Sequence, residues 1–339
     1  MKIWIDLVNA PHVRFFSKLI HSHLGEVDSL LVTARDYGYL RSLSELLMPD
    51  VDVVFCGRWR ETREGKLIEH CSRIIELARL VAEFSPDVAI SKASPELARV
   101  SFGLGIPSVN LNDNELAFHV SKLVFPLSSV VVVPEVFPEE ALRELGAVCR
   151  VRKFRGVCEV SHVLGYELPE EVGDDVVVRP EPAGSSYVSG RSRIVEAVLR
   201  LANDLPNLKF VLFPRGEDWR RLLKLGKRIR VQEEAVDSIP LLSRAWGFIG
   251  AGGTMTREAA LLGTPSISMF PGREPSVTLL LEREGLIYRT EDPSEAVEAI
   301  IELSGKRKEL RRRAAKFISS CEDPTEVVWE EAMDLTDNY

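Results

Sequence analysis

The stretch at residues 248–268, FIGAGGTMTREAALLGTPSIS, joins a short apolar run to three glycines and then to a segment that favours helix. The apolar start predicts the end of a buried strand, and residues 266–270 predict the next strand. Thr254 is placed to cap the helix, and Gly263 followed by Pro265 predicts its end. The glycines that permit a tight turn and a close approach to the backbone are Gly250, Gly252 and Gly253. The stretch therefore predicts a strand, a glycine turn, a helix and a second strand.

The start of this predicted helix is a candidate anion site, because the helix N–H groups and the positive end of the helix dipole meet there. Phosphate is the usual anion at such a site. Glu258 falls about one turn into the helix, where its carboxylate could accept hydrogen bonds from ribose hydroxyls. The alternative is a tight turn of an α/β domain with nothing bound, since short glycine motifs are common.

Length and composition bound the possible functions. The chain has 339 residues, which predicts two domains with separate cores, and its net charge of −8 argues against a broad nucleic-acid interface. No apolar run reaches the length of a membrane span, and MKIWIDL at the start predicts a strand rather than a signal peptide. Five scattered cysteines without a C-x-x-C pair predict neither a zinc site nor a disulfide framework, which fits a cytoplasmic protein.

Strand-like apolar runs alternate with amphipathic helical runs along most of the chain, which predicts mainly parallel sheets. The polar segment 165–175, GYELPEEVGDD, interrupts this rhythm and predicts a linker. We therefore expect an α/β protein of two doubly wound, Rossmann-like domains facing across a cleft. The expected boundaries are 1–164 for the first domain, 165–315 for the second, and 316–339 for a C-terminal helix that could pack back on the first.

Open α/β sheets bind ligands beyond the carboxyl ends of their strands, so the polar residues at those ends are candidates. In the first domain, His12 follows the first strand, and the ordinary pKa of imidazole suits proton transfer near neutrality. Asp113 and Glu115 follow another strand, and a carboxylate there could act as a general base. The first-domain residues expected to bind substrate are Asn9, Lys92, Ser94 and Glu96.

Each of these residues also has a structural interpretation. His12 could cap the first helix, and Asp113 or Asn114 could cap the helix that follows them. Asp6 is expected to be buried at a strand end, where its hydrogen bonds would orient the turn.

In the second domain, arginines follow several predicted strands, and guanidinium groups match phosphate oxygens in a bidentate way. These residues are Arg179, Arg215 and Arg273, and the loops around them include residues 180–187. The alternative for each arginine is a surface or interdomain salt bridge. The Asp-x-Asp tripeptide at 50–52 begins a strand, at the wrong end of the sheet for a site metal, so no metal is expected. The basic run KRKELRRR at 306–313 predicts a solvated helix face, with peripheral membrane contact as the alternative.

The second domain resembles the donor-binding half of GT-B glycosyltransferases and of UDP-N-acetylglucosamine 2-epimerases. The similarity rests on the glycine turn with Glu258, and on PGREP at 271–275, which is a looser match and includes Arg273 and Glu274. The whole chain resembles still more closely an uncharacterised prokaryotic family, a domain of unknown function that is grouped with GT-B proteins. The segments that carry this likeness are DLVNAPH at 6–12, TARDY at 33–37, GLGIP at 103–107, NDNE at 112–115 and VRP at 178–180.

The resemblance implies a metal-independent glycosyltransferase that uses a nucleotide-diphosphate sugar, for example a UDP-sugar, as substrate and needs no cofactor. The second domain would bind the donor and the first domain the acceptor. His12, Asp113 or Glu115 would take the proton, while Glu274 and the arginines would bind the donor. The alternatives are a nucleotide-sugar 2-epimerase and an inactive nucleotide-sugar-binding protein. The base, the sugar, the acceptor and the oligomeric state do not follow from the sequence.

Overall fold

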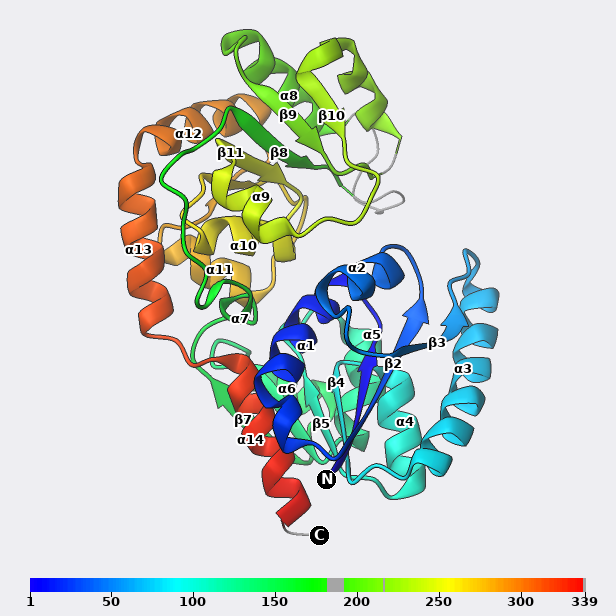
Figure 1. The fold of residues 1–339 in the computed structure, drawn as a ribbon. Coiled ribbons are helices and arrows are strands. Elements are labelled where there is room, and N and C mark those ends of the chain that lie inside the picture. Colours follow the sequence, from blue (N-terminus) through cyan, green and yellow to red (C-terminus); the bar gives the residue numbers. More distant parts are fainter. Residues whose placement is uncertain (182–191, 216, 338–339) are drawn as a thin grey trace. The chain divides into compact units, whose positions relative to one another are not determined.

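The computed structural model describes residues 1–181, 192–215 and 217–337. It divides the chain into two compact units, each an α/β domain built on one sheet (Figure 1). Unit 1 contains Met1–Ser161 and Cys321–Tyr339, and unit 2 contains His162–Ser320. The predicted α/β class is confirmed.

Unit 1 has a seven-stranded sheet in the order β3-β2-β1-β4-β5-β6-β7, with every pair parallel. The strands are β1 (Lys2–Leu7), β2 (Ser29–Asp36), β3 (Val53–Arg58), β4 (Val88–Lys92), β5 (Ser108–Leu111), β6 (Val130–Pro134) and β7 (Arg150–Phe154). The helices are α1 (Ala10–His23), α2 (Leu40–Leu47), α3 (Arg63–Phe84), α4 (Pro95–Leu104), α5 (Phe118–Val124), α6 (Glu139–Leu145) and α14 (Pro324–Asp337), with short 3-10 turns η1 (Leu24–Glu26) and η2 (Phe125–Leu127). Strands β4, β5 and β6 are buried along their whole length, as expected where helices cover both faces of a parallel sheet.

The last helix, α14, belongs to the core of unit 1. Trp329 of α14 stacks on His23 at the end of α1, with ring centroids 4.2 Å apart. Val328 and Ala332 are fully buried in the same cluster as the apolar side chains of β1 and α1. In Figure 1 this helix is red and lies beside α1.

Unit 2 has a six-stranded parallel sheet in the order β10-β9-β8-β11-β12-β13. The strands are β8 (Asp175–Arg179), β9 (Lys209–Leu212), β10 (Ile229–Val231), β11 (Gly247–Gly250), β12 (Ser266–Ser268) and β13 (Tyr288–Arg289). The helices are α8 (Arg193–Asp204), α9 (Ser238–Arg244), α10 (Thr254–Leu261), α11 (Ser276–Arg283), α12 (Pro293–Gly305) and α13 (Arg307–Ser319), with the 3-10 segment η3 (Asp218–Arg228). The short helix α7 (Val160–Val163) carries the chain from unit 1 to unit 2.

The basic run 306–313 lies at the start of α13 and is not wholly solvated, in contrast to the prediction. The Arg307 guanidinium is half-buried and donates a hydrogen bond to the carbonyl oxygen of Trp246 at 2.8 Å. Burial, together with the neighbouring charge of Arg311, lowers the pKa of Arg307 to about 10. Arg307 therefore anchors α13 to the residue that precedes β11.

Candidate functional site

Each sheet has one topological switch point, where the order of the strands reverses along the chain. In unit 1 it lies between β1 and β4, and in unit 2 between β8 and β11. Ligands of open α/β sheets bind at the carboxyl ends of the strands that flank such a point. The candidate residues after β1 and β4 in unit 1, and after β8 and β11 in unit 2, therefore lie where the topology favours a site.

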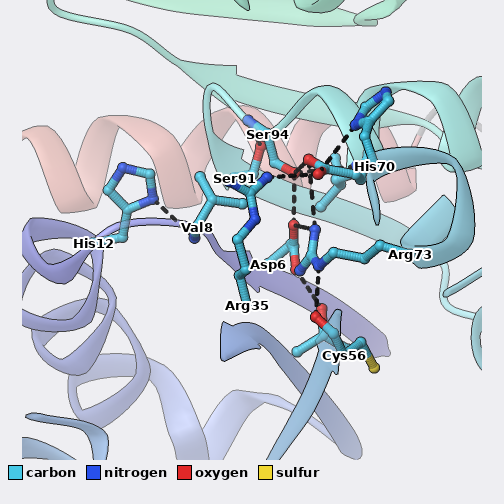
Figure 2. A network of polar contacts seen from close by, with 12 residues as sticks. Asp6, Val8, His12, Arg35, Cys56, His70, Arg73, Ser91 and Ser94 are labelled. Atoms are coloured by element: carbon cyan, nitrogen blue, oxygen red, sulfur yellow. Dashed lines mark hydrogen bonds and ion pairs between the residues drawn. The ribbon is translucent and has the colours of Figure 1, made fainter. Parts of the chain in front are cut away.

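His12 lies in the first turn of α1, buried to 5% exposure. Its Nδ1 accepts a 3.4 Å hydrogen bond from the backbone N–H of Val8 (Figure 2). Burial, with the positive charges of Lys92 and Arg35, lowers the pKa of His12 to about 3, although Asp113 opposes the shift. A neutral ring that accepts at Nδ1 carries its proton on Nε2. His12 is therefore a hydrogen-bond donor at Nε2, and it does not readily accept a proton near neutral pH.

Lys92 and Asp113 form an ion pair at 3.1 Å between the ends of β4 and β5. Both side chains are about nine-tenths buried. The next residue after Lys92, Ala93, has φ +52°, a left-handed conformation that is uncommon for a residue other than glycine. Backbone strain of this kind clusters at functional sites, and here it turns the chain from β4 into α4.

A buried polar network connects the turn between β4 and α4 to β1 and α3 (Figure 2). Asp6, at the end of β1, has no exposed surface, which confirms its predicted burial. Its carboxylate accepts hydrogen bonds from Ser94 Oγ at 2.5 Å and from the Arg73 guanidinium at 2.5 and 3.1 Å. Ser94 Oγ also accepts from the N–H of Leu97 and so caps α4. Ser94 is thus a structural link between β1 and α4.

Glu96 is held inside the same network rather than presented to a ligand. Its Oε1 lies 2.5 Å from the Arg35 guanidinium and 3.1 Å from His70 Nδ1. Burial by itself would raise the pKa of Glu96, but the hydrogen bond from His70 and the charges of Arg73 and Arg35 lower it to about 2. Glu96 is therefore ionised and fixes Arg35 at the carboxyl edge of the sheet.

The loop after β5 keeps its shape through its asparagines. Asn112 Oδ1 accepts from the N–H of Asn114 at 2.9 Å, and Asn114 Oδ1 accepts from the N–H of Leu116 at 3.0 Å. Helix α5 starts later, at Phe118. The alternative that Asp113 or Asn114 caps this helix is therefore wrong.

The remaining first-domain candidates differ in exposure. Glu115 lies in this loop and is buried to 8% exposure. Asn9 is exposed and occupies the N-cap position of α1, but its side chain makes no capping hydrogen bond. The structure thus brings His12, Lys92 and Asp113 together at one edge, with Asn9 at its border.

The glycine turn of unit 2 has the geometry that its sequence predicts. Gly252 and Gly253 both have positive φ angles, +65° and +84°. Gly253 occupies the N-cap position of α10, so the expectation that Thr254 caps the helix is wrong: Thr254 is its first residue. A Cβ atom built on Gly253 would have no heavy atom of the described residues within 4 Å. In the described part of the chain, the backbone at the start of α10 is therefore open at Gly253.

Glu274 closes the other side of the turn. Its carboxylate oxygens would lie 3.0 Å from a Cβ atom on Gly252, and it accepts a 2.5 Å hydrogen bond from Ser268 Oγ. Burial raises the pKa of Glu274, although hydrogen bonds and nearby arginines oppose the shift. A buried carboxyl group whose pKa is raised by burial therefore lies against the glycine turn.

The three candidate arginines lie in different settings. Arg179 pairs in register with Gly250, and its NH1 lies 3.3 Å from Met255 Sδ at the start of α10. Arg215 is half-buried in the loop after β9, and Arg273 is exposed next to Glu274. Of these three, Arg179 is the one that the strand register places beside the glycine turn. Of the predicted loop 180–187, residues 182–187 lie outside the described residues.

Glu258 has partners that the sequence did not reveal. One carboxylate oxygen lies 2.8 Å from His162 Nδ1, and the other accepts a 2.8 Å hydrogen bond from Ser238 Oγ. His162 Nε2 is buried and has no hydrogen-bond partner among the described residues. His162 lies 96 positions before Glu258, so no local pattern could indicate this contact. A ribose hydroxyl at Glu258 would have to share the carboxylate with these two residues.

Within the described ranges, no three His, Cys, Asp or Glu side chains converge as metal ligands would. None of the helices described in the structure has the length and apolar character needed to cross a membrane.

Comparison with solved structures shows the fold. UDP-GlcNAc 2-epimerase from Neisseria meningitidis, solved with UDP-GlcNAc bound, matches with a TM-score of 0.68 at 14% identity, over 98% of this chain and 100% of that one. The UDP-GlcNAc 2-epimerase of Methanocaldococcus jannaschii matches with a TM-score of 0.65 at 16% identity, over 96% of each chain. The glycotransferase of kitacinnamycin matches with a TM-score of 0.60 at 15% identity, over 96% and 97%. The predicted pair of Rossmann-like GT-B domains is confirmed.

Comparison of sequences assigns the chain to a family. It is 35% identical to the uncharacterized protein MJ0665 of Methanocaldococcus jannaschii over 345 residues, which cover 97% of each chain. A family profile described as "Protein of unknown function (DUF354)" matches residues 1–337. The chain therefore belongs to the DUF354 family, a group with the GT-B fold, as the sequence resemblance predicts.

Proposed function

We propose that this protein is a glycosyltransferase that uses a nucleotide-diphosphate sugar, with the donor bound by unit 2 and the acceptor by unit 1. The observation that carries the proposal is the open turn at Gly253. Two successive glycines with positive φ lead from β11 into α10, and the N-cap residue has no side chain to occupy the helix end. Backbone N–H groups in this setting bind phosphate well.

The surroundings of the turn support a diphosphate ligand. Arg179 lies beside the turn. Arg215 follows β9, which pairs with β8, and Arg273 follows β12, which pairs with β11. In the proposed reaction these guanidinium groups stabilise the negative charge that develops on the leaving diphosphate, and no metal is required. Glu258 accepts from the ribose hydroxyls while it keeps its contacts with His162 and Ser238, since an ionised carboxylate has about four acceptor positions.

Unit 1 supplies the groups for the acceptor. Because His12 is neutral and donates at Nε2, we assign it to binding an oxygen atom of the substrate. Asp113 or Glu115 then takes the proton of the attacking hydroxyl. Lys92, paired with Asp113, orients that carboxylate. The acceptor hydroxyl attacks the anomeric carbon as the nucleotide diphosphate leaves.

A second candidate function is a nucleotide-sugar 2-epimerase. Glu274 favours it, because a buried carboxyl group with a raised pKa next to the glycine turn could exchange protons close to a donor sugar. Proteins described as UDP-GlcNAc 2-epimerases share the fold. That reaction needs no separate acceptor, so the two functions predict different products.

The test is calorimetric titration with UDP-, GDP-, ADP- and dTDP-sugars, followed by product analysis. We expect one nucleoside diphosphate to bind at least tenfold more tightly than its nucleoside, since the turn recognises phosphate. Sugar transfer or slow hydrolysis supports the transferase, an epimerised sugar supports the epimerase, and binding without turnover supports an inactive nucleotide-sugar-binding protein. If no nucleoside diphosphate binds, all three are wrong. Glu258→Gln should weaken binding of the ribose-containing ligands but not of inorganic pyrophosphate.

A further inference from the structure

Helix α3 presents an apolar outer face that nothing in the described structure covers. Leu67, Ile68 and Ile75 are 64%, 58% and 55% exposed, whereas the opposite face of the helix is buried through Arg73 and Leu77. Large aliphatic side chains grouped on one face of a helix at this exposure indicate a surface that packs against another molecule. Figure 1 shows α3 at the β3 side of unit 1.

The exposed residues follow the spacing of a helix-packing seam. Ile68, Cys71, Ile75 and Ala82 are all exposed, and they recur at intervals of three, four and seven residues. This is the a/d spacing with which one helix packs along another. The helix spans 22 residues, or about 33 Å, which is long enough for several turns of such packing.

The same face is complementary to itself in the antiparallel direction. Ile68 lies three residues before Cys71, and Ile75 lies three residues after Ser72. Glu64 lies seven residues before Cys71, and Arg79 lies seven residues after Ser72. A two-fold axis at the midpoint between Cys71 and Ser72 would therefore set each isoleucine against the other isoleucine of a second copy, and each Glu64 against an Arg79.

Charge distinguishes a second copy from other occupants of this face. Neither Glu64 nor Arg79 forms an ion pair within the described ranges of the chain, and both are exposed. An anionic membrane surface would select a face with cations alone. This face also carries Glu76 and Glu83. Charges of both signs at symmetric positions fit a copy of the same helix.

We propose that α3 is the core of a two-fold homodimer interface, in which two α3 helices pack antiparallel through Ile68, Cys71 and Ile75. The interface lies on the outer side of α3 and uses none of the residues at the carboxyl edge of the sheet. It is therefore independent of the proposed function.

Light scattering coupled to size exclusion tests the interface. We expect the wild type to be a dimer of 38.0 kDa chains at micromolar concentration. Ile75→Glu should raise the dimer dissociation constant by roughly a hundredfold, because it buries a charge against Ile68 of the second copy at two symmetric points of the seam. The matched control is Leu123→Glu, which changes an equally exposed leucine on α5 and should leave the dimer intact. A monomeric wild type, or a dimer that Ile75→Glu leaves unchanged, would overturn the proposal.

Two measurements define the register. Glu64→Arg and Arg79→Glu should each weaken the dimer severalfold, and the double variant should restore it. Cys71, the exposed cysteine, should cross-link to Cys71 of the second copy with a short bismaleimide, and Cys71→Ser should abolish this product. If the double charge variant is no better than the single ones and Cys71 does not cross-link, the antiparallel register is wrong.

Discussion

The carboxyl edges of the two sheets are built in opposite ways. At the edge of unit 1, charged side chains are buried and locked to one another: Asp6 is bound to Arg73, Glu96 to Arg35, and Lys92 to Asp113. At the edge of unit 2, the central feature is a turn of two glycines, in which the Glu274 carboxylate lies against Gly252 and the backbone of Gly253 is exposed. The first edge is a preorganised set of charges, and the second is a turn that leaves room for a ligand.

This difference separates stability from binding. Side chains that hold one another in a buried network cannot be removed without leaving a charge unpaired, so substitutions in unit 1 should act mainly on folding. A glycine turn with open space in front of it contributes little packing, so substitutions there should act mainly on ligand affinity. Four predictions follow this contrast, from the largest expected effect to the smallest.

Arg73→Met should lower the free energy of unfolding by about 3–5 kcal/mol, because it leaves the buried carboxylates of Asp6 and Glu96 without their shared cation. Urea denaturation at pH 7 measures the change. Arg99→Met, at an exposed arginine of α4, is the control and should change stability by at most about 0.5 kcal/mol. A loss below about 1 kcal/mol for Arg73→Met would mean that the network does not hold the edge together.

His12 should make the protein less stable in mild acid. The pKa of His12 is about 3 in the folded protein and 6.5 as an ordinary side chain, so the unfolded chain takes up the proton first as the pH falls. The stabilisation is complete above pH 6.5 and declines toward the folded pKa, by about 2 kcal/mol between pH 7 and pH 5. His12→Gln should lack this part of the pH dependence, as measured by denaturation at both pH values. Parallel pH profiles for the two proteins would contradict the assignment of a neutral His12.

Gly253→Ala should weaken nucleotide-diphosphate binding about tenfold, or 1.4 kcal/mol, because φ +84° is unfavourable for alanine and the turn must shift. Titration calorimetry gives the affinity. Gly305→Ala, in α12, also adds a Cβ that meets nothing within 4 Å but requires no change of backbone conformation. Equal affinities for the two variants would place the ligand elsewhere.

Glu274 should give the binding a modest pH dependence. Because burial raises the pKa of Glu274, ionisation of this carboxyl group is less favourable in the folded protein than in the unfolded chain. As the pH rises through that pKa, ionisation removes some folding stability and brings a negative charge next to the diphosphate. The affinity of wild type relative to Glu274→Gln should therefore fall as the pH rises through that pKa, as measured by titration calorimetry over a series of pH values. A constant ratio would show that Glu274 does not face the ligand.

The fold could be predicted from the sequence because apolar strand-like runs alternate with amphipathic helical runs along most of the chain. Helix α4, Pro95–Leu104, begins at a proline and is followed by Gly105, which are the positions where these two residue types favour the ends of a helix. Strand β7, RVRKF, escaped prediction because an edge strand is only partly buried and tolerates charges at alternate positions. The GT-B architecture followed from the resemblance around the glycine turn.

The candidate site was less accessible to prediction. The glycine turn is a local motif, so its conformation could be expected, apart from the shift of the N-cap from Thr254 to Gly253. The partners of Glu258 and Asp6 come from distant segments, and Arg73 lies in a helix whose pattern would suit a solvated arginine. Burial and pairing at such positions depend on tertiary contacts that no window of sequence contains. The roles of His12, Asp113 and Glu115 stay predictions.

The return of the chain to unit 1 through α14 has a consequence for the order in which the protein is made. The first core cannot be completed until Val328, Trp329 and Ala332 leave the ribosome, although most of that domain is synthesised first. Unit 2 can therefore finish folding before α14 completes the core of unit 1. A short truncation at the C-terminus would therefore damage the beginning of the protein and spare its middle.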